Sequence, residues 1–433
     1  MPQTCDLRRP AVTPGELISE LYKVSSAEPD WRDDRGKRHV LAEVLVVTVL
    51  ALIAGAQNAE DVAAFGKANL DWFRRFLVLR NGTPAHDLIL DVLAVLKPEK
   101  MMEIIRDWLT VVRGEFKLSL NGAHVAFDGQ RLRGSMDRAA GNQGVHLVSA
   151  YATAIGHFVA TVAVDEKTNE IPVVQQMIGS LDLRGATISA DAMHCQTQTA
   201  AAARTAGAHY VLQVKENQPV LLADCKATAA ALARRVRPGE SKVRADAHTD
   251  TDKGHGRVEK RKSIVCRDLS HISASGQWVD LQAVVIVLRE RFEVLTGKSS
   301  QETSYYITSR QEAGAEQIGE IVRDHWLQEN RGHWVLDCVF GSDSHQVRQR
   351  NAAVNFGMLR RFCAGLVDNV VGWGQSRRRV RMQCGWSPDT LLSVLAGQVI
   401  DRPRMRRVNR KGAKDEVPPA RRRTCATQAD PTK

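Results

Sequence analysis

Three acidic residues stand at positions from which their carboxylates could meet at one site. Asp128 ends the stretch HVAFDG, and Asp191 lies at the end of ATISADA. Both stretches favour β-strands because they are short and rich in small and β-branched residues. Glu329 lies in the amphipathic stretch AEQIGEIVRDHWLQENRGHWVL. Ligands bind where strands end in an α/β sheet, so we predict that the three side chains converge there.

Converging carboxylates suit divalent cations, because Mg²⁺ and Mn²⁺ prefer oxygen ligands. Two such ions about 3.5–4 Å apart activate a nucleophile and stabilise the leaving oxygen in phosphoryl transfer. An aspartate after a strand also commonly caps a turn, and this role stays open for Asp128 or Asp191 taken alone. The set of three predicts a Mg²⁺ or Mn²⁺ site, with Asp337 as a weaker further candidate.

Glu329 falls on the apolar face of the helix expected around it. At i, i+3, i+4 and i+7 spacing, one face of a single continuous helix carries Ile318, Ile321, Val322, His325, Trp326, Glu329, His333 and Leu336. An unpaired buried carboxylate is unfavourable unless it takes up a proton, so a cationic group should meet Glu329. On this interpretation Trp326 and Trp334 are core residues.

The elements expected around these residues predict an α/β fold that follows a helical N-terminal region. Residues 15–115 are typical of successive helices. Residues 124–165 predict three sequential antiparallel strands, after which helices and strands alternate to residue 218, so a mixed sheet follows. Residues 219–302 break this alternation with a helix, a long polar stretch and strand-like runs, which indicates an insertion with β content.

The charge of the chain is concentrated at its C-terminal end. Of a formal net charge of +11, residues 371–433 contribute 15 Lys and Arg against 5 Asp and Glu, or +10. A basic, Pro-containing segment of this kind favours disorder and binding to polyanions. A solubilising tail is the alternative.

Cysteine spacing and hydropathy indicate a soluble cytoplasmic protein. The eight cysteines form no CxxC pair and no zinc-type cluster, so we interpret them as reduced thiols. The N-terminus is too polar for a signal peptide. The apolar run at residues 40–56 contains Glu43 and fits a buried helix rather than a membrane span. A length of 433 residues allows two to four domains.

Seven motif regions follow one another between about residues 25 and 366. They are DWRDDRGKRHVL with LIAGAQNAEDVAAF, FDGQRLRGS, KTNEIPVVQQMIGSLDLRGATISADAMHCQ, YVLQVKENQP, HGRVEKR, YYITS and RDHWLQENRGHWVLDCVF. In this order they resemble the DDE transposases of bacterial insertion sequences, in the H-repeat-associated family. The chain departs from that pattern at Gln130, where the family usually has Lys, at Glu216, where it has Gly, and at Leu327, Gln328 and Gly332.

The resemblance implies an RNase H-like mixed sheet with a β-rich insertion before the glutamate helix. It also implies Mg²⁺- or Mn²⁺-dependent cleavage of DNA at the element's ends and joining to target DNA, with Asp128, Asp191 and Glu329 as the triad. Double-stranded DNA would be the partner of a homodimer in a synaptic complex. The implied domains are a helical DNA-binding domain (1–118), two parts of the catalytic core (119–218 and 303–370), the insertion (219–302) and a disordered basic tail (371–433).

Ten residues are predicted to contact DNA. Arg131 and Arg133 follow Asp128, and guanidinium groups suit phosphate, although solvated surface charge is the alternative. The other eight are His194, Lys215, Asn217, Arg257, Lys260, Arg261, His325 and His333. For His194 a role in positioning a carboxylate, or as a loop histidine, stays open. For His333 a hydrogen bond to a carboxylate is the alternative, and for Lys215 and Asn217 a role in the turn. The three basic residues of HGRVEKR are either contacts to a transposon end or exposed strand charges.

Two other functions compete with transposition. A hydrolytic nuclease on the same fold would cut DNA without joining it. A catalytically silent or repurposed transposase would bind DNA as a regulator. The intact set of Asp128, Asp191 and Glu329 argues against the silent protein, because random drift would not selectively spare those three positions.

Overall fold

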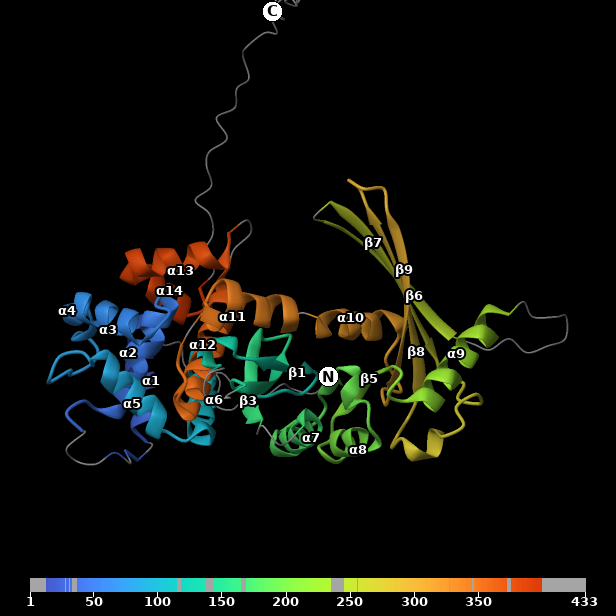
Figure 1. The fold of residues 1–433 in the computed structure, drawn as a ribbon, viewed down its shortest axis with the longest axis horizontal. Coiled ribbons are helices and arrows are strands. Elements are labelled where there is room, and N and C mark those ends of the chain that lie inside the picture. The colour runs from blue at the N-terminus through green and yellow to red at the C-terminus, as the bar shows by residue number, and fades with distance from the viewer. Residues whose placement is uncertain are drawn as a thin grey trace, which may run out of the picture.

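A helical body and a long mixed sheet make up the protein, seen side by side in the computed structural model (Figure 1). The structure describes residues 13–27, 29–30, 32, 37–114, 118–136, 143–164, 169–234, 245–254, 256–326, 328–344, 346–371 and 375–398. No helix in these ranges combines the length and the apolar character that crossing a membrane requires.

Between residues 13 and 114 the structure describes six helices, where the sequence predicts successive helices. They are α1 (Pro14–Ser26), α2 (Leu41–Ile53), α3 (Ala59–Ala68), α4 (Leu70–Phe73), α5 (His86–Val95) and α6 (Pro98–Val112). Every residue of α2 is buried, which suits a helix that is apolar all round. Its one carboxylate, Glu43, accepts a hydrogen bond from the backbone N–H of Leu79 at 2.7 Å, so this buried acidic group is satisfied.

Three C-terminal helices complete the same helical core. They are α12 (Arg350–Val370), α13 (Arg377–Trp386) and α14 (Pro388–Leu395). Buried side chains of α13 and α14 pack in one hydrophobic cluster with those of α1, α2, α5 and α6. The first and last described helices therefore pack together in the helical body (Figure 1).

The prediction of a disordered segment at residues 371–433 is wrong for residues 377–386 and 388–395, which are helical. Arg381, counted among the basic tail charges, is 4% exposed. Its guanidinium donates to the backbone oxygens of Leu52 at 2.7 Å and of Ala56 at 3.0 Å, and to that of Val339. The many charged residues of this segment make the apolar pattern of its helices hard to recognise from the sequence. Residues 399–433 lie outside the described residues.

One nine-stranded sheet runs through the rest of the chain. Its strands are β1 (His124–Arg131), β2 (His146–Ala152), β3 (His157–Val164), β4 (Thr187–Ala190), β5 (His209–Val214), β6 (Ala245–Gly254), β7 (Arg257–Cys266), β8 (Ala283–Glu293) and β9 (Ser299–Thr308). The order is β3-β2-β1-β4-β5-β9-β8-β7-β6. β1 to β3 form the predicted antiparallel meander, while β4 and β5 run parallel to β1. Helices α7 (Glu170–Ser180) and α8 (Thr197–Thr205) precede β4 and β5, so the predicted mixed α/β sheet is confirmed.

The segment predicted as an insertion extends this sheet after helix α9 (Pro219–Ala233). β9 pairs with β5, and β8, β7 and β6 follow it outward (Figure 1). The sequence does not predict β6, because none of its side chains is buried and it therefore shows no apolar alternation. Backbone pairing with β7 holds this polar strand.

The two faces of the sheet bury different partners. Val125, Phe127 and Ile188 belong to the hydrophobic cluster that also contains residues of α7, α8 and α9. Because side chains alternate along a strand, Asp128 and Ser189 point to the opposite face. Helix α10 (Ala315–His325) covers that opposite face, packing Ile318 in a cluster with residues of β5, β7, β8 and β9.

Candidate active site

Asp128 and Asp191 lie side by side on neighbouring parallel strands. Phe127 of β1 is in register with Ala190 of β4, and the two aspartates are the next residues along. Asp128 lies within β1, which continues to Arg131, so the prediction that it ends its strand is wrong. Asp191 directly follows β4 as predicted. The sheet thus brings together two of the three predicted carboxylates.

The two carboxylates have opposite pKa shifts. Burial, together with the charge of Asp191, raises the pKa of Asp128 to about 6. The pKa of Asp191 is lowered, mainly because His325 hydrogen-bonds to its carboxylate with Nε2 and Oδ1 3.2 Å apart. A buried carboxyl that resists ionisation beside an ionised one marks a place where a cation would be favourable.

The helix predicted to carry Glu329 is interrupted before this residue. Helix α10 ends at His325, a π-helical segment spans Gln328–His333, and α11 (Trp334–Cys338) follows. The prediction of one continuous helix is therefore wrong. A π-helix bonds i to i+5 and shifts the side-chain register, and such segments are frequent at functional sites.

This register shift exposes Glu329. Gln328 takes the inward position, fully buried, and its Nε2 donates to the backbone oxygen of Ser149 at 3.2 Å. Glu329 is exposed rather than on a buried face. Trp326 and Trp334 are 44% and 56% exposed, so their predicted core positions are also wrong.

Glu329 faces a hollow of about 430 Å³ beside β1. The hollow is lined by Gly129, Gln130, Arg131, Arg133, Glu329, His333, Trp334, Asp337 and Asp343. Two of the predicted phosphate contacts, Arg131 and Arg133, therefore share a surface with Glu329. Arg133 Nε also lies 3.8 Å from Asp343 Oδ2, and its side chain is 77% exposed.

His333 links this hollow to Asp128. Its Nδ1 lies 3.4 Å from Asp128 Oδ2, and its ring stacks on Phe158 at 6.5 Å between centroids and 8° between planes. Burial lowers the pKa of His333 to about 3, so the ring is neutral at pH 7. Gly332 is required here because a Cβ would come within 2.7 Å of the Phe158 ring. This close packing accounts for a glycine in the π-helical segment.

The aspartate pair fits a divalent cation in its chemistry. It offers carboxylate oxygens, which Mg²⁺ and Mn²⁺ prefer, and burial together with the charge of Asp191 makes ionisation of Asp128 unfavourable without a cation. Across the part of the chain that the structure describes, no three His, Cys, Asp or Glu side chains are spaced to hold a metal ion together. Glu329 as a third ligand stays a prediction.

Gln130 holds the strand of Asp128 against the helical body. Its Nε2 donates to Asp337 Oδ1 at 3.1 Å, and its Oε1 accepts from Arg361 Nη2 at 2.8 Å. Arg361, on α12, is 1% exposed. Burial and the charge of Asp343 raise the pKa of Asp337 to about 6. The sequence does not predict a role for Arg361, because its pattern does not distinguish a buried arginine in a long helix from an exposed one.

A second acidic group lies under β1 and was also missed. Glu170, the first residue of α7, has its carboxylate 2.5 Å from His146 Nε2 and 3.7 Å from His194 Nε2. These histidines lower the pKa of Glu170 to about 2. His194 is 1% exposed, so it positions a carboxylate and does not present its ring to DNA. A Cβ on Gly129 would come within 2.5 Å of Glu170 Oε2.

The other predicted DNA contacts fall into two groups. Lys215 and Asn217 follow β5 at the same edge as Asp191, and Asn217 Nδ2 donates to the Ala192 oxygen at 2.7 Å. In the sheet order, β7 is separated from β1 by β4, β5, β9 and β8. Arg257, Lys260 and Arg261 on β7 are therefore not brought to the aspartates. Arg261 pairs instead with Glu259 at 2.7 Å.

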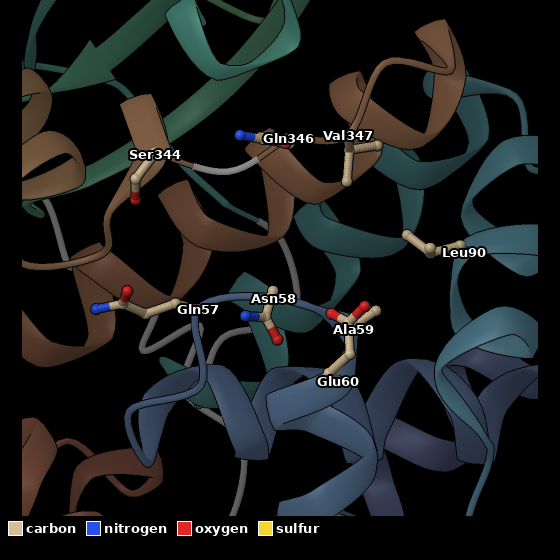
Figure 2. Close-up of a pocket in the computed structure, with 8 residues that line it drawn as sticks. All are labelled: Gln57, Asn58, Ala59, Glu60, Leu90, Ser344, Gln346 and Val347. Atoms are coloured by element: carbon tan, nitrogen blue, oxygen red, sulfur yellow. The ribbon is translucent and has the colours of Figure 1, made fainter.

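A further hollow, of about 500 Å³, opens between the start of α3 and the segment that follows α11 (Figure 2). Its lining residues are Gln57, Asn58, Ala59, Glu60, Leu90, Ser344, Gln346 and Val347. None of them is a predicted site residue, so this hollow is separate from the candidate site of Asp128, Asp191 and Glu329.

Comparison with known families identifies the part of the chain that forms the sheet. The model of the Transposase DDE domain matches residues 120–366. This chain belongs to that family. A model described as DDE_Tnp_1-associated matches residues 26–109, which cover most of α2 to α6 of this DDE transposase.

Curated relatives extend over nearly the whole DDE transposase. The H repeat-associated putative transposase YhhI of Escherichia coli K12 is 29% identical over 88% of this chain and 98% of its own. The putative protein YbfL of the same strain is 30% identical over the same shares. The protein is thus a bacterial DDE transposase of the H-repeat family. A piggyBac transposase synaptic complex with hairpin DNA aligns over 90% of this chain at 14% identity, but its TM-score of 0.37 is too low to define the fold.

Proposed function

We propose that this DDE transposase cleaves DNA at the ends of a bacterial insertion sequence and joins those ends to target DNA. The observation that carries this proposal is the aspartate pair, in which burial and Asp191 raise the pKa of Asp128 to about 6. The strand order β3-β2-β1-β4-β5, with α7 and α8 as crossovers, supports an RNase H-like core.

Asp128, Asp191 and Glu329 would hold Mg²⁺ or Mn²⁺ in this proposal. Such ions, when bound, polarise the phosphate and help to generate the nucleophile. Other residues of the protein orient these carboxylates. His333 holds Asp128 from the π-helical segment, and Asn217 fixes the loop after Asp191.

Double-stranded DNA is the proposed partner. Arg131 and Arg133 lie beside Glu329 in the same hollow, where their guanidinium groups could bind the phosphate backbone. Two element ends must be held together before they are joined, so we propose that a homodimer forms the synaptic complex. Lys215, exposed at the edge of Asp191, is a further backbone contact in this arrangement.

The product of the reaction tests this proposal. The intact protein is incubated in Mg²⁺ with a duplex carrying the DNA that flanks its coding sequence, together with a supercoiled plasmid. We expect plasmid joined covalently to the duplex. Cut duplex without joined product would identify a hydrolytic nuclease, and binding without cutting would identify a silent regulator. Either result contradicts the proposed function.

The basic C-terminal segment should govern non-specific DNA binding. Truncation after Gln398 keeps α14 and removes residues 399–433, which carry 11 Lys and Arg against 4 Asp and Glu, or +7. Because each neutralised phosphate contributes about −0.9 to the slope of log K against log salt, we expect weaker binding and a flatter slope. Phosphate contacts read no sequence, so discrimination between element ends and random duplex should be kept.

A salt titration of both proteins on end and random duplexes measures this slope. Arg378→Gln, at an exposed position on α13, is a control that removes one charge and leaves residues 399–433 in place. An unchanged slope after truncation would mean that the segment only solubilises the protein.

A further inference from the structure

A chain of hydrogen bonds runs through buried side chains and ends at Asp191. His124 Nε2 lies 2.7 Å from Ser189 Oγ, and Ser189 Oγ lies 2.8 Å from His325 Nδ1. His325 Nε2 then lies 3.2 Å from Asp191 Oδ1. At the far end, Thr153 Oγ1 is 3.3 Å from both His124 Nδ1 and the His124 backbone oxygen. Each side chain in this series of hydrogen bonds therefore has a polar partner.

This chain joins the elements that carry the three candidate carboxylates. His124 lies on β1, the strand of Asp128, and Ser189 lies on β4, two residues before Asp191. They are 8% and 4% exposed. His325 is the last residue of α10, four residues before Glu329. The hydrogen bonds therefore fix the end of α10 onto both strands.

The carboxylate of Asp191 sets the direction of these hydrogen bonds, and the single hydrogen of the Ser189 hydroxyl continues it. An ionised Asp191 only accepts, so His325 Nε2 must carry a hydrogen and donate it. In the Nε2–H tautomer, Nδ1 of His325 accepts from the Ser189 hydroxyl, whose oxygen accepts from His124 Nε2. Burial lowers the pKa of His124 to about 3, which keeps that ring neutral. In this arrangement each hydrogen has one acceptor.

We propose that Ser189 and His325 are positioning residues for Asp191 and for the segment carrying Glu329. Asp191 requires the Nε2–H tautomer of His325, and the Ser189 hydroxyl donates to Nδ1 and so holds the ring in this orientation. The Nε2–H then holds Asp191 Oδ1 so that the other carboxylate oxygen is presented to a cation. This inference rests on the proposed function of Asp191 as a metal ligand. The sequence predicts a DNA contact for His325, but both of its ring nitrogens are already engaged within the protein.

Removal of the hydroxyl tests the role of Ser189. Groups that orient a metal ligand typically change metal affinity by 10–100-fold. In the full-length protein without DNA, we expect Ser189→Ala to weaken Mn²⁺ binding by about tenfold, measured by electron paramagnetic resonance of free Mn²⁺. Ser189→Thr keeps a hydroxyl and should restore most of the affinity. Unchanged affinity in a folded Ser189→Ala protein would overturn the proposal.

Ser25→Ala is the matched control for a lost buried hydroxyl. Ser25 is fully buried in α1, donates to the Leu21 oxygen at 2.8 Å and accepts from Trp108 Nε1 at 3.0 Å. This variant should lose stability as a buried serine variant does, yet bind Mn²⁺ like the wild type. An equal loss of affinity in Ser25→Ala would assign the effect to general destabilisation and overturn the proposal.

Ring ¹⁵N chemical shifts of histidine give a readout that needs no metal. In the metal-free protein at neutral pH, we expect the Nε2–H tautomer for His325, with its signals assigned by their absence in His325→Gln. In Ser189→Ala the tautomer should be kept by Asp191, but Nδ1 loses its hydrogen-bond donor, so the ¹⁵N signal of Nδ1 should shift downfield. An Nδ1–H tautomer in the wild type, or an unaltered spectrum in Ser189→Ala, overturns the hydrogen-bond chain. If the wild type binds no Mn²⁺, the metal role in the proposed function fails, while these spectra still decide whether Ser189 orients His325.

Discussion

Asp128→Asn, Asp191→Asn and Glu329→Gln should each reduce DNA cleavage in Mg²⁺ by about 10³-fold or more. Each change keeps the shape of the side chain and removes one negative charge that would bind a cation. Metal stabilisation of a phosphoryl-transfer transition state contributes several kcal/mol, and each 1.4 kcal/mol is about tenfold in rate. Single-turnover cleavage of an end duplex, with the fraction cut followed over time, measures the loss.

The same variants should remain folded, and one should become more stable. The pKa of Asp128 in the folded protein is raised to about 6 from an ordinary 3.8. Its protonated form therefore stabilises the fold at low pH, and that stability is lost as pH rises through 6. Asp128→Asn, which cannot ionise, should raise Tm in EDTA at pH 8 and have little effect at pH 3.5. A thermal scan at both pH values separates this outcome from general misfolding.

Asp337→Asn is the matched control for the three carboxylate variants. Asp337 lines the same hollow as Glu329, but its carboxylate accepts hydrogen bonds from Gln130. We expect Asp337→Asn to keep cleavage within about tenfold of the wild type. A near wild-type rate in any of the three triad variants would contradict the assignment of that residue. A loss in Asp337→Asn as large as theirs would place it among the metal ligands.

The aspartate pair could be predicted from the sequence because the signals that place it are local. HVAFDG and ATISADA are short apolar stretches, and the parallel pairing of β1 with β4 brings Asp128 and Asp191 to one level. The position of Glu329 could not be predicted in the same way. The i, i+3, i+4 pattern places side chains correctly only if the α-helix is regular throughout. The π-helical segment breaks that regularity, and it depends on contacts with β2 and β3, which are distant in sequence.

Two of those contacts show why the helical pattern fails. Gln328 reaches the backbone of Ser149 on β2, and Gly332 packs against Phe158 on β3. Neither partner can be read from the residues between 315 and 338. The hydrogen-bond chain from His124 to His325 has the same origin, because it joins residues about 200 positions apart through the sheet. Such tertiary contacts, rather than propensity, set the geometry around the candidate ligands.

Truncation after Val371 should destabilise the protein severely, although composition alone predicts a disordered tail there. This change removes α13 and α14, whose side chains Val380, Leu391, Val394 and Leu395 are at most 1% exposed. Burial of an aliphatic side chain contributes about 1.5–3 kcal/mol, so roughly 6 kcal/mol or more is lost, comparable to the whole stability of many domains. We expect insoluble protein or a Tm lowered by more than about 10 °C. Truncation after Gln398 is the control and should keep the wild-type Tm. Equal melting of the two truncated proteins would mean that α13 and α14 contribute nothing to the helical core.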